Sequence, residues 1–222
     1  MFNNLSRLVA EFFGAGILTC VVIGSGIMGD RLSSDDGISL IINAFSPVSA
    51  LVVLILILSP ISGAHFNPVV SLVALASKTQ KAATTIGYIF AQVTGAVLGA
   101  IVGNVMFEVP AIQFSTHNRI TSATFLGEVI ATAGLIAVIG ILAAHKQEKF
   151  IVWGVAGWIL PAIFFTSSTS FANPAVTIGR EFSDTFAGIS PMSVLPFIAA
   201  QLVGGALGYL ATKSVTRTTT KR

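Results

Sequence analysis

Six long apolar stretches constrain the fold of this chain more than any other feature of its sequence. They lie at about Leu5–Met28, Ile38–Leu58, Ala82–Phe107, Ser122–Ala144, Phe150–Thr169 and Ser193–Thr212. A helix of about 20 apolar residues crosses the roughly 30 Å hydrocarbon core of a bilayer. Only 9% of the 222 residues are charged and the mean hydropathy is +0.87, whereas a water-soluble domain carries far more surface charge. The sequence therefore predicts an all-α membrane protein with six transmembrane helices.

Lysine and arginine gather on alternate connections between these stretches. One side carries most of them, namely Arg7, Lys78, Lys81, Lys146, Lys149, Lys213, Arg217, Lys221 and Arg222. The other side carries Arg31, Arg119 and Arg180 together with Asp30, Asp35, Asp36 and Glu108. By the positive-inside rule the first side is cytoplasmic, which predicts a multi-pass protein of the cell (inner) membrane with both termini in the cytoplasm. The net charge of +3 thus reflects topology and predicts no nucleic-acid partner.

The two halves of the chain repeat each other. Three matched pairs of segments mark the repeat: Ala10–Phe12 with Gly127–Val129, Ala91–Ala96 with Ala200–Gly205, and Asn67–Ser71 with Asn173–Thr177. Each half holds three spans, an odd number, so we expect the second half to run inverted relative to the first. We therefore expect a single domain over 1–222, with repeat one at about 1–107 and repeat two at about 120–215. Inverted repeats place the solute path near the membrane midplane, where the halves meet.

Two connections are too apolar for ordinary loops and too short to span the membrane. They cover about 59–77 and 166–182, and each contains an Asn-Pro step, at 67–68 and at 173–174. Proline suits the first turn of a helix, and asparagine is a favoured N-cap. We therefore expect two re-entrant half-helices. Non-helical backbone at membrane depth is tolerated only against protein or a water-filled cavity, so these segments predict a pore.

Each half-helix is expected to point its positive end at the centre of the membrane. The extended residues before them offer backbone carbonyls to a permeating molecule, namely Gly63, Ala64, His65 and Phe66 in the first half and Ser170, Phe171 and Ala172 in the second. The amides of Asn67 and Asn173 would donate hydrogen bonds at the midpoint. Because converging helix dipoles oppose protons and cations, we expect a pore for water and small uncharged solutes. No catalytic residue, metal site or cofactor is predicted.

The chain resembles the aquaporin or major intrinsic protein family over essentially its whole length. The similarity rests on Ser62–Val70, on Asn173–Ala175 and on Ala10–Phe12. The resemblance implies an aquaporin-like fold, in which six transmembrane helices and two re-entrant half-helices form an inverted 3+3 repeat. It further implies a homotetramer with one pore in each subunit. Glu11 and Glu128 resemble the family's paired buried glutamates, which brace the re-entrant loops.

Two positions depart from the family pattern. The first Asn-Pro-Ala box reads Asn67–Pro68–Val69, whereas the second, Asn173–Pro174–Ala175, keeps its alanine. Arginine usually follows the second box and lines the outer constriction, but Val176 stands there. Arg180 lies one helical turn further out, at about 5.4 Å along the axis. Two interpretations of Arg180 stay open: it is a displaced filter, or it pairs with Asp184 or caps nearby carbonyls.

The remaining constriction positions bear on which solutes can pass. Counting back from the asparagines, they fall near Pro47, Pro161 and Ser170. Together with Val176 these residues would form a wider and more apolar constriction than a strict water filter, which predicts passage of solutes larger than water. The segment 168–180 also resembles a bacterial subgroup with a displaced arginine, for which metalloid acids such as arsenite are among the suggested solutes. Glycerol, urea, boric acid and arsenite are all neutral at pH 7, and the sequence does not rank them.

Other functional classes are weighed against a channel. A secondary active transporter also uses inverted repeats, but it needs a coupling site, and only Glu11 and Glu128 offer ionisable groups within the spans. A membrane hydrolase would have to build on Ser62 and His65, and no third group to orient them is evident. A non-conducting structural member would assemble without permeability.

His65 itself is interpreted either as a vestibule residue or as a titrating gate.

Overall fold

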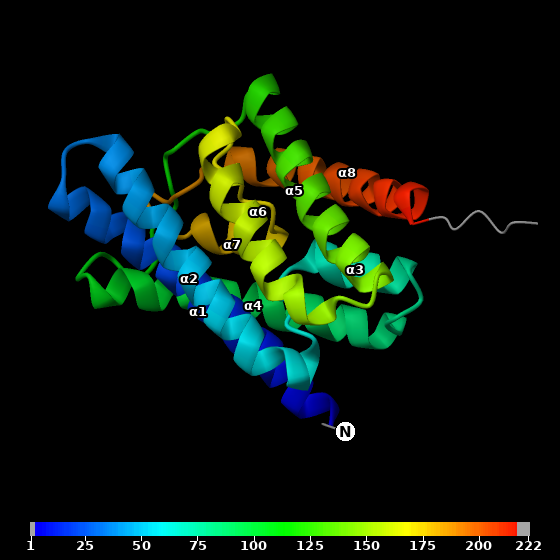
Figure 1. Ribbon diagram of the computed structural model, residues 1–222. Coiled ribbons are helices and arrows are strands. Elements are labelled where there is room, and N and C mark those ends of the chain that lie inside the picture. The colour runs from blue at the N-terminus through cyan, green and yellow to red at the C-terminus, as the bar shows by residue number, and fades with distance from the viewer. Residues whose placement is uncertain (1–2, 217–222) are drawn as a thin grey trace, which may run out of the picture.

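The computed structural model describes residues 3–216, and in this range the regular structure is all helical, without a strand (Figure 1). Six helices are long and apolar enough to cross a membrane: α1 (Asn4–Leu32), α2 (Asp36–Ser62), α4 (Ala82–Met106), α5 (Ser122–Ala144), α6 (Ile151–Phe165, preceded by the 3-10 turn η1, Glu148–Phe150) and α8 (Pro191–Val215). Two further helices, α3 (Pro68–Ala76) and α7 (Pro174–Arg180), are too short to cross. The predicted fold class is confirmed. Arg217, Lys221 and Arg222, used above to assign the cytoplasmic side, lie outside the described residues.

Several helix ends differ from the predicted boundaries because local backbone signals override the apolar pattern. α2 runs on to Ser62, since Gly63 takes a φ of 92° and ends the helix in the left-handed region. The fifth span stops at Phe165, because Thr166 already has extended backbone (φ −95°, ψ 140°). The first re-entrant segment therefore begins at Gly63, later than predicted, and the second begins at Thr166.

In each half, the first and third spans cross at very close range. A Cβ atom on Gly99 of α4 would lie 2.0 Å from the carbonyl oxygen of Gly16 in α1. In the second half, a Cβ atom on Gly208 of α8 would lie 2.4 Å from the carbonyl oxygen of Ala133 in α5. Small residues let helix backbones approach in this way, which is the usual packing mode inside a membrane. The same device therefore holds α1 to α4 and α5 to α8.

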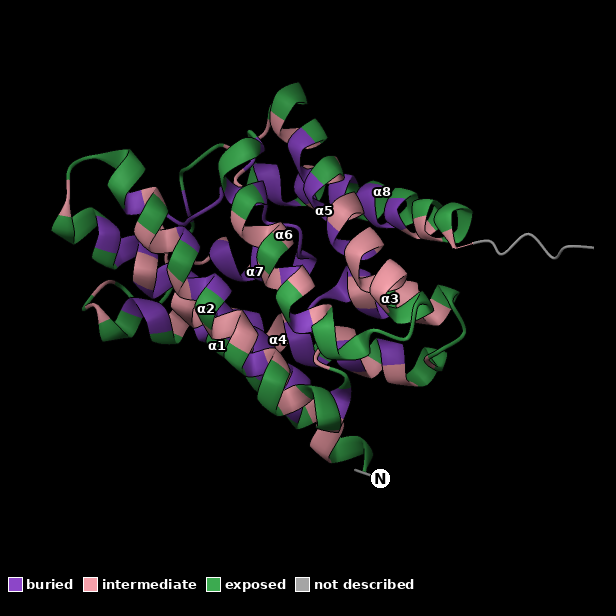
Figure 2. Cartoon of the chain, viewed as in Figure 1, coloured by how far each residue is buried: buried purple, intermediate pink, exposed green. Residues whose placement is uncertain are grey.

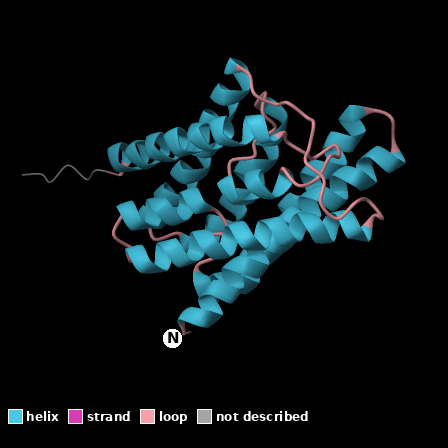
Figure 3. Ribbon diagram, turned by 180° about the vertical axis from the view of Figure 1, so that it is seen from behind, coloured by secondary structure: helices cyan, strands magenta, loops and turns pink. Residues whose placement is uncertain are grey.

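The outer surface of the bundle is apolar. Large side chains such as Phe90, Met192 and Leu195 are 72%, 80% and 75% exposed. Buried residues gather on the inner helix faces and around the segments that lead into α3 and α7 (Figure 2). Seen from behind, helices again enclose the centre and most loops lie at the helix ends (Figure 3). An apolar exterior around a core with polar groups fits a lipid environment.

A candidate pore between two short helices

The two short helices begin with the same local structure. The side chain of Asn67 accepts a hydrogen bond from the backbone N–H of Val69 at 2.9 Å, and Asn173 accepts one from Ala175 at 3.0 Å. A proline follows each asparagine at the first helical position, where the missing N–H leaves no bond unmade. The N-caps predicted from the sequence are therefore present in both helices.

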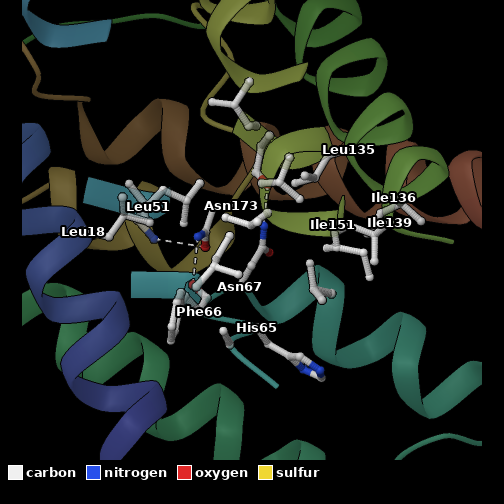
Figure 4. Close-up of a pocket in the computed structure, with 18 of the residues that line it drawn as sticks. Leu18, Leu51, His65, Phe66, Asn67, Leu135, Ile136, Ile139, Ile151 and Asn173 are labelled. Atoms are coloured by element: carbon white, nitrogen blue, oxygen red, sulfur yellow. Dashed lines mark hydrogen bonds between the residues drawn. The ribbon is translucent and has the colours of Figure 1, made fainter. Parts of the chain in front are cut away.

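The two asparagines also tie the halves together. Asn67 Nδ2 donates to the carbonyl oxygen of Ala172 at 2.7 Å, and Asn173 Nδ2 donates to the carbonyl oxygen of Phe66 at 2.9 Å (Figure 4). Each helix cap is thereby linked to the extended segment of the opposite half. An amide nitrogen carries two hydrogens. Each asparagine therefore keeps a second N–H donor that these bonds do not use.

Glu11 holds the first extended segment from within α1. Its carboxylate accepts the backbone N–H groups of His65 at 3.0 Å and Phe66 at 2.7 Å, and it also accepts Gln92 Nε2 at 2.7 Å and the Ser62 hydroxyl at 2.6 Å. The side chain is fully buried. All of these groups are donors, so only a carboxylate with two acceptor oxygens satisfies them.

Glu128 repeats this arrangement in the second half. It accepts the backbone N–H groups of Phe171 at 2.8 Å and Ala172 at 2.9 Å, and Gln201 Nε2 at 2.6 Å. It is also fully buried. Both carboxylates therefore bind backbone donors of the re-entrant segments, which is the bracing geometry that the family resemblance implies.

The braced segments have an unusual backbone. Ala64 and Phe66 take φ values of 53° and 50°, and Ser170 and Ala172 take 50° and 47°. Residues with a Cβ rarely adopt the left-handed region, and they persist there only when surrounding contacts fix them. The two glutamates supply such contacts. The backbone carbonyls are thus held in fixed directions instead of pairing within a helix.

One cavity of about 970 Å³ passes both asparagines. Its lining comes from α1, α2, α5, α6 and α8 as well as from both short helices. Among the residues singled out from the sequence, the lining includes Pro47, Gly63, Ala64, His65, Phe66, Asn67, Ser170, Phe171, Ala172, Asn173, Val176 and Arg180. The other box residues are buried outside the lining: Pro68, Val69, Pro174 and Ala175. Figure 4 shows that much of the wall is aliphatic, with Leu18, Leu51, Leu135, Ile136 and Ile139 around the polar centre.

The position assigned to Pro161 is wrong. Pro161 is exposed on the outer side of α6 and is not part of the cavity wall. Ile159 and Ile163 line the cavity from this helix instead. Successive helical residues are about 100° apart, so an offset of two residues turns a side chain to the opposite face. Two isoleucines of α6 therefore face the cavity on either side of Pro161 in the sequence.

Arg180 lies beside Phe171 at the edge of the cavity. Its guanidinium carbon is 3.4 Å from the centre of the Phe171 ring, and its Nε donates to the carbonyl oxygen of Ala187. Asp184 does not pair with it; that carboxylate instead accepts the backbone N–H of Thr116 at 2.8 Å and lies 3.9 Å from His117 Nε2. Of the contacts weighed above, the carbonyl contact forms and the ion pair does not. The residue also reaches the cavity wall, as a displaced filter would.

Arg119 is a residue of this region that the sequence did not single out as part of a site. It comes from the loop between α4 and α5, and its guanidinium carbon lies 5.6 Å from the centre of the Phe171 ring. It donates to the carbonyl oxygens of Gly188 and Phe186, both at 2.6 Å. Burial lowers the pKa of Arg119, but an arginine remains protonated. No motif surrounds Arg119 in the sequence, so only the fold reveals that two cations flank one aromatic ring.

His65 lines the cavity and contacts polar groups on its protein side. Its Nδ1 lies 3.0 Å from Ser71 Oγ, and Ser71 Oγ accepts Gln92 Nε2 at 3.0 Å. Its ring meets the Tyr88 ring edge-on at 5.4 Å between centroids. These contacts fit the interpretation of His65 as a vestibule residue.

Comparisons with known proteins agree with this geometry. Residues 1–151 match the family model described as Major intrinsic protein. The chain is 42% identical to "Aquaglyceroporin AqpS" of Rhizobium meliloti, covering 91% of this chain and 87% of that protein. It is 31% identical to "Aquaporin NIP3-1" of Arabidopsis thaliana, covering 79% of this chain and 58% of that protein.

A solved structure shares the fold. The aquaglyceroporin from Plasmodium falciparum superposes with a TM-score of 0.75 at 22% identity, covering 97% of this chain and 96% of that one. The likeness extends over both halves, including the region beyond residue 151 that the family model does not match. The chain therefore belongs to the major intrinsic protein family, whose members are membrane channels and not enzymes.

Proposed function

We propose that this channel passively conducts water together with small uncharged solutes, with glycerol as the first candidate. Urea, boric acid and arsenite are further candidates, because all of them are neutral and small. The name of the Rhizobium meliloti relative, an aquaglyceroporin, supports a solute range beyond water. The bracing role of Glu11 and Glu128 argues against a coupled transporter, since both carboxylates are already occupied by backbone donors.

A single observation carries this proposal: Val176 lines the cavity at the position where the family usually has arginine. The side chain is apolar, only 4% exposed and packed with Leu18, Leu54 and Phe66. An apolar wall on one side of the path suits the carbon backbone of a polyol. Free N–H donors on Asn67 and Asn173 suit its hydroxyl groups.

The remaining site roles are part of the same proposal. The carbonyls of Gly63–Phe66 and Ser170–Ala172 would accept hydrogen bonds from the solute along the path. Pro47, Ser170, Val176 and Arg180 would form the outer constriction, with Ile163 in place of Pro161. Arg180 would present its unused guanidinium N–H groups to solutes from one turn beyond Val176. Converging positive ends of α3 and α7 would oppose cations and protons.

We propose the architecture that follows from these roles. The chain forms a single channel domain over 1–222, with repeats at about 1–107 and 120–215, in the cell (inner) membrane. Both termini face the cytoplasm, as the distribution of lysine and arginine favours. Four copies assemble as a homotetramer with one pore in each. Cysteine accessibility from either side of right-side-out vesicles tests the orientation, and native mass spectrometry tests the tetramer.

Stopped-flow light scattering on proteoliposomes tests the solute range. Wild type is compared with Val176→Arg and with Val176→Leu, a control of increased volume without charge. We expect wild type to pass water and glycerol. Val176→Arg should keep water permeability and lose at least about tenfold in glycerol permeability, because the added cation narrows the constriction. Val176→Leu should keep most of both permeabilities.

The outcomes separate the alternatives. If wild type passes water but not glycerol, the wide constriction is wrong and Arg180 filters the solutes instead. Equal glycerol loss in Val176→Leu and Val176→Arg would show that volume, and not the missing cation, sets the limit. If wild type passes neither solute under any condition, a non-conducting structural member replaces the channel.

A further inference from the structure

The valine of the first box, Val69, packs into a space beside Gly205 of α8. Val69 is 2% exposed and belongs to the first turn of α3. A Cβ atom built on Gly205 of α8 would lie 2.4 Å from Val69 Cγ1, far inside van der Waals contact. Val69 therefore occupies space that exists only because residue 205 has no side chain.

The internal repeat shows that this pairing is a difference between the halves. Val69 corresponds to Ala175 in the second box, and Gly205 corresponds to Ala96 in α4. The pair related by the repeat, Ala175 and Ala96, thus has alanine at both positions, while this pair has valine in the first half and glycine in the second. Val69 is larger than Ala175 by two carbon atoms, and Gly205 lacks the methyl group of Ala96. The larger residue in α3 is thus accompanied by a smaller one in α8. Gly204, by contrast, faces α5: a Cβ there would lie 2.5 Å from the carbonyl oxygen of Val129.

Val69 is connected directly to the pore centre. Its backbone N–H donates to Asn67 Oδ1 at 2.9 Å and so fixes the amide plane. The same amide donates from Nδ2 to the carbonyl oxygen of Ala172 at 2.7 Å, which leaves the remaining hydrogen for a solute. A shift of Val69 therefore changes the direction of this donor.

We infer that Gly205 is a positioning residue for the pore asparagine of the first half. By leaving room for Val69, it lets the start of α3 sit against α8 and sets the direction of the free Asn67 N–H. Valine is branched at Cβ and strongly prefers one χ1 rotamer in a helix, so turning Cγ1 away from a side chain at 205 costs free energy. The start of α3 would have to move, and Asn67 with it. The inference rests on the proposed channel function for its effect on permeation.

Five variants test this inference in proteoliposomes: Gly205→Ala, Val69→Ala, the double variant that combines these two changes, Gly204→Ala as the matched control, and Val69→Ala combined with Gly204→Ala. The readout is the water permeability for each folded protein, together with its activation energy. The activation energy does not depend on how much protein has folded, so a merely structural defect leaves it unchanged. We expect Gly205→Ala to lower the permeability by roughly tenfold and to raise the activation energy.

The double variant has alanine at both positions, as in the pair Ala175 and Ala96 related by the repeat, and should recover to within about twofold of wild type. Val69→Ala should not rescue Gly204→Ala, because that glycine contacts α5. The inference is overturned if Gly205→Ala conducts like wild type, or if its activation energy is unchanged. It is also overturned if Val69→Ala fails to rescue Gly205→Ala, or rescues both glycine variants alike.

Failure of the channel proposal is distinguishable from failure of this inference. If wild type conducts nothing, the melting temperatures of the same variants still report whether Val69 fills the space that Gly205 leaves free. Rescue of the Gly205→Ala melting temperature by Val69→Ala would support this packing of Val69 against Gly205. Additive losses would refute it whatever the protein conducts.

Discussion

At the residue scale, one buried carboxylate in each half accepts the hydrogen bonds that hold a re-entrant segment in place. Glu128 accepts three N–H groups with two oxygens, and two of these donors belong to backbone that has no partner within a helix. A buried donor that loses its acceptor costs about 1–3 kcal/mol. The position of the second re-entrant segment therefore depends on both oxygens of Glu128 being acceptors.

We predict that Glu128→Gln destabilises the protein by about 1–3 kcal/mol and sharply lowers water permeability. The new amide nitrogen is a donor that faces other donors, so at least one backbone N–H loses its partner. Thermal unfolding in detergent measures the loss. Glu108→Gln, on an exposed loop, is the control and should melt like wild type. Equal melting of the two variants would rule out the bracing role.

At the scale of helices, the close crossing of α1 and α4 depends on Gly99 having no side chain. We predict that Gly99→Ala lowers stability by about 1–3 kcal/mol, because the added Cβ meets the carbonyl oxygen of Gly16 at 2.0 Å and the helices must separate. Gly157→Ala is the control, since nothing lies within 4 Å of a Cβ there. Thermal unfolding of both variants checks this. A Gly99→Ala protein as stable as Gly157→Ala would contradict the packing account.

The loop between α4 and α5 is attached to the segment after α7 by a carboxylate. The backbone N–H of Thr116 is the main cause that lowers the pKa of Asp184, and His117, 3.9 Å away, adds to it. A carboxyl whose folded pKa is below its unfolded value of about 3.9 contributes stability above that pH and loses it as the pH falls through the folded pKa. The attachment should therefore weaken only in acid.

We predict that Asp184→Ala speeds amide hydrogen exchange at Thr116 near neutral pH. The difference from wild type should shrink only as the pH falls through the lowered folded pKa of Asp184, which lies below the unfolded value of about 3.9. Asp30→Asn, a change at an exposed carboxylate on α1, should leave this exchange unchanged. Equal protection of the Thr116 amide in Asp184→Ala and in wild type near neutral pH would show that Asp184 does not hold the loop.

Helix identity could be predicted from the sequence, but the rotation of uniformly apolar helices could not. The six spans and both half-helices followed from apolar length, Asn-Pro steps and the repeat. Pro161 was misplaced because α6 is apolar on all sides, so its sequence does not indicate which face meets the cavity. Arg119 was missed for a related reason: a loop arginine without a motif acquires its position beside Phe171 only through tertiary contacts.

At the scale of the whole molecule, the two halves converge on one path. Each half supplies a carboxylate brace, an extended segment of carbonyls and a capping asparagine, and each asparagine bonds to the opposite half. The exterior of the described bundle is apolar, and the cavity brings a solute past these polar groups at its centre. The halves are alike in their braces and differ in the valine, glycine and arginine positions that surround them.

The most direct measurement of the central claim is the osmotic water and glycerol permeability of proteoliposomes with the wild-type protein, by stopped-flow light scattering over a range of temperatures. The account predicts that both permeabilities exceed those of empty liposomes, with a low activation energy for water and no accompanying proton leak. Permeabilities equal to those of empty liposomes, at a protein density confirmed by electron microscopy, would contradict it.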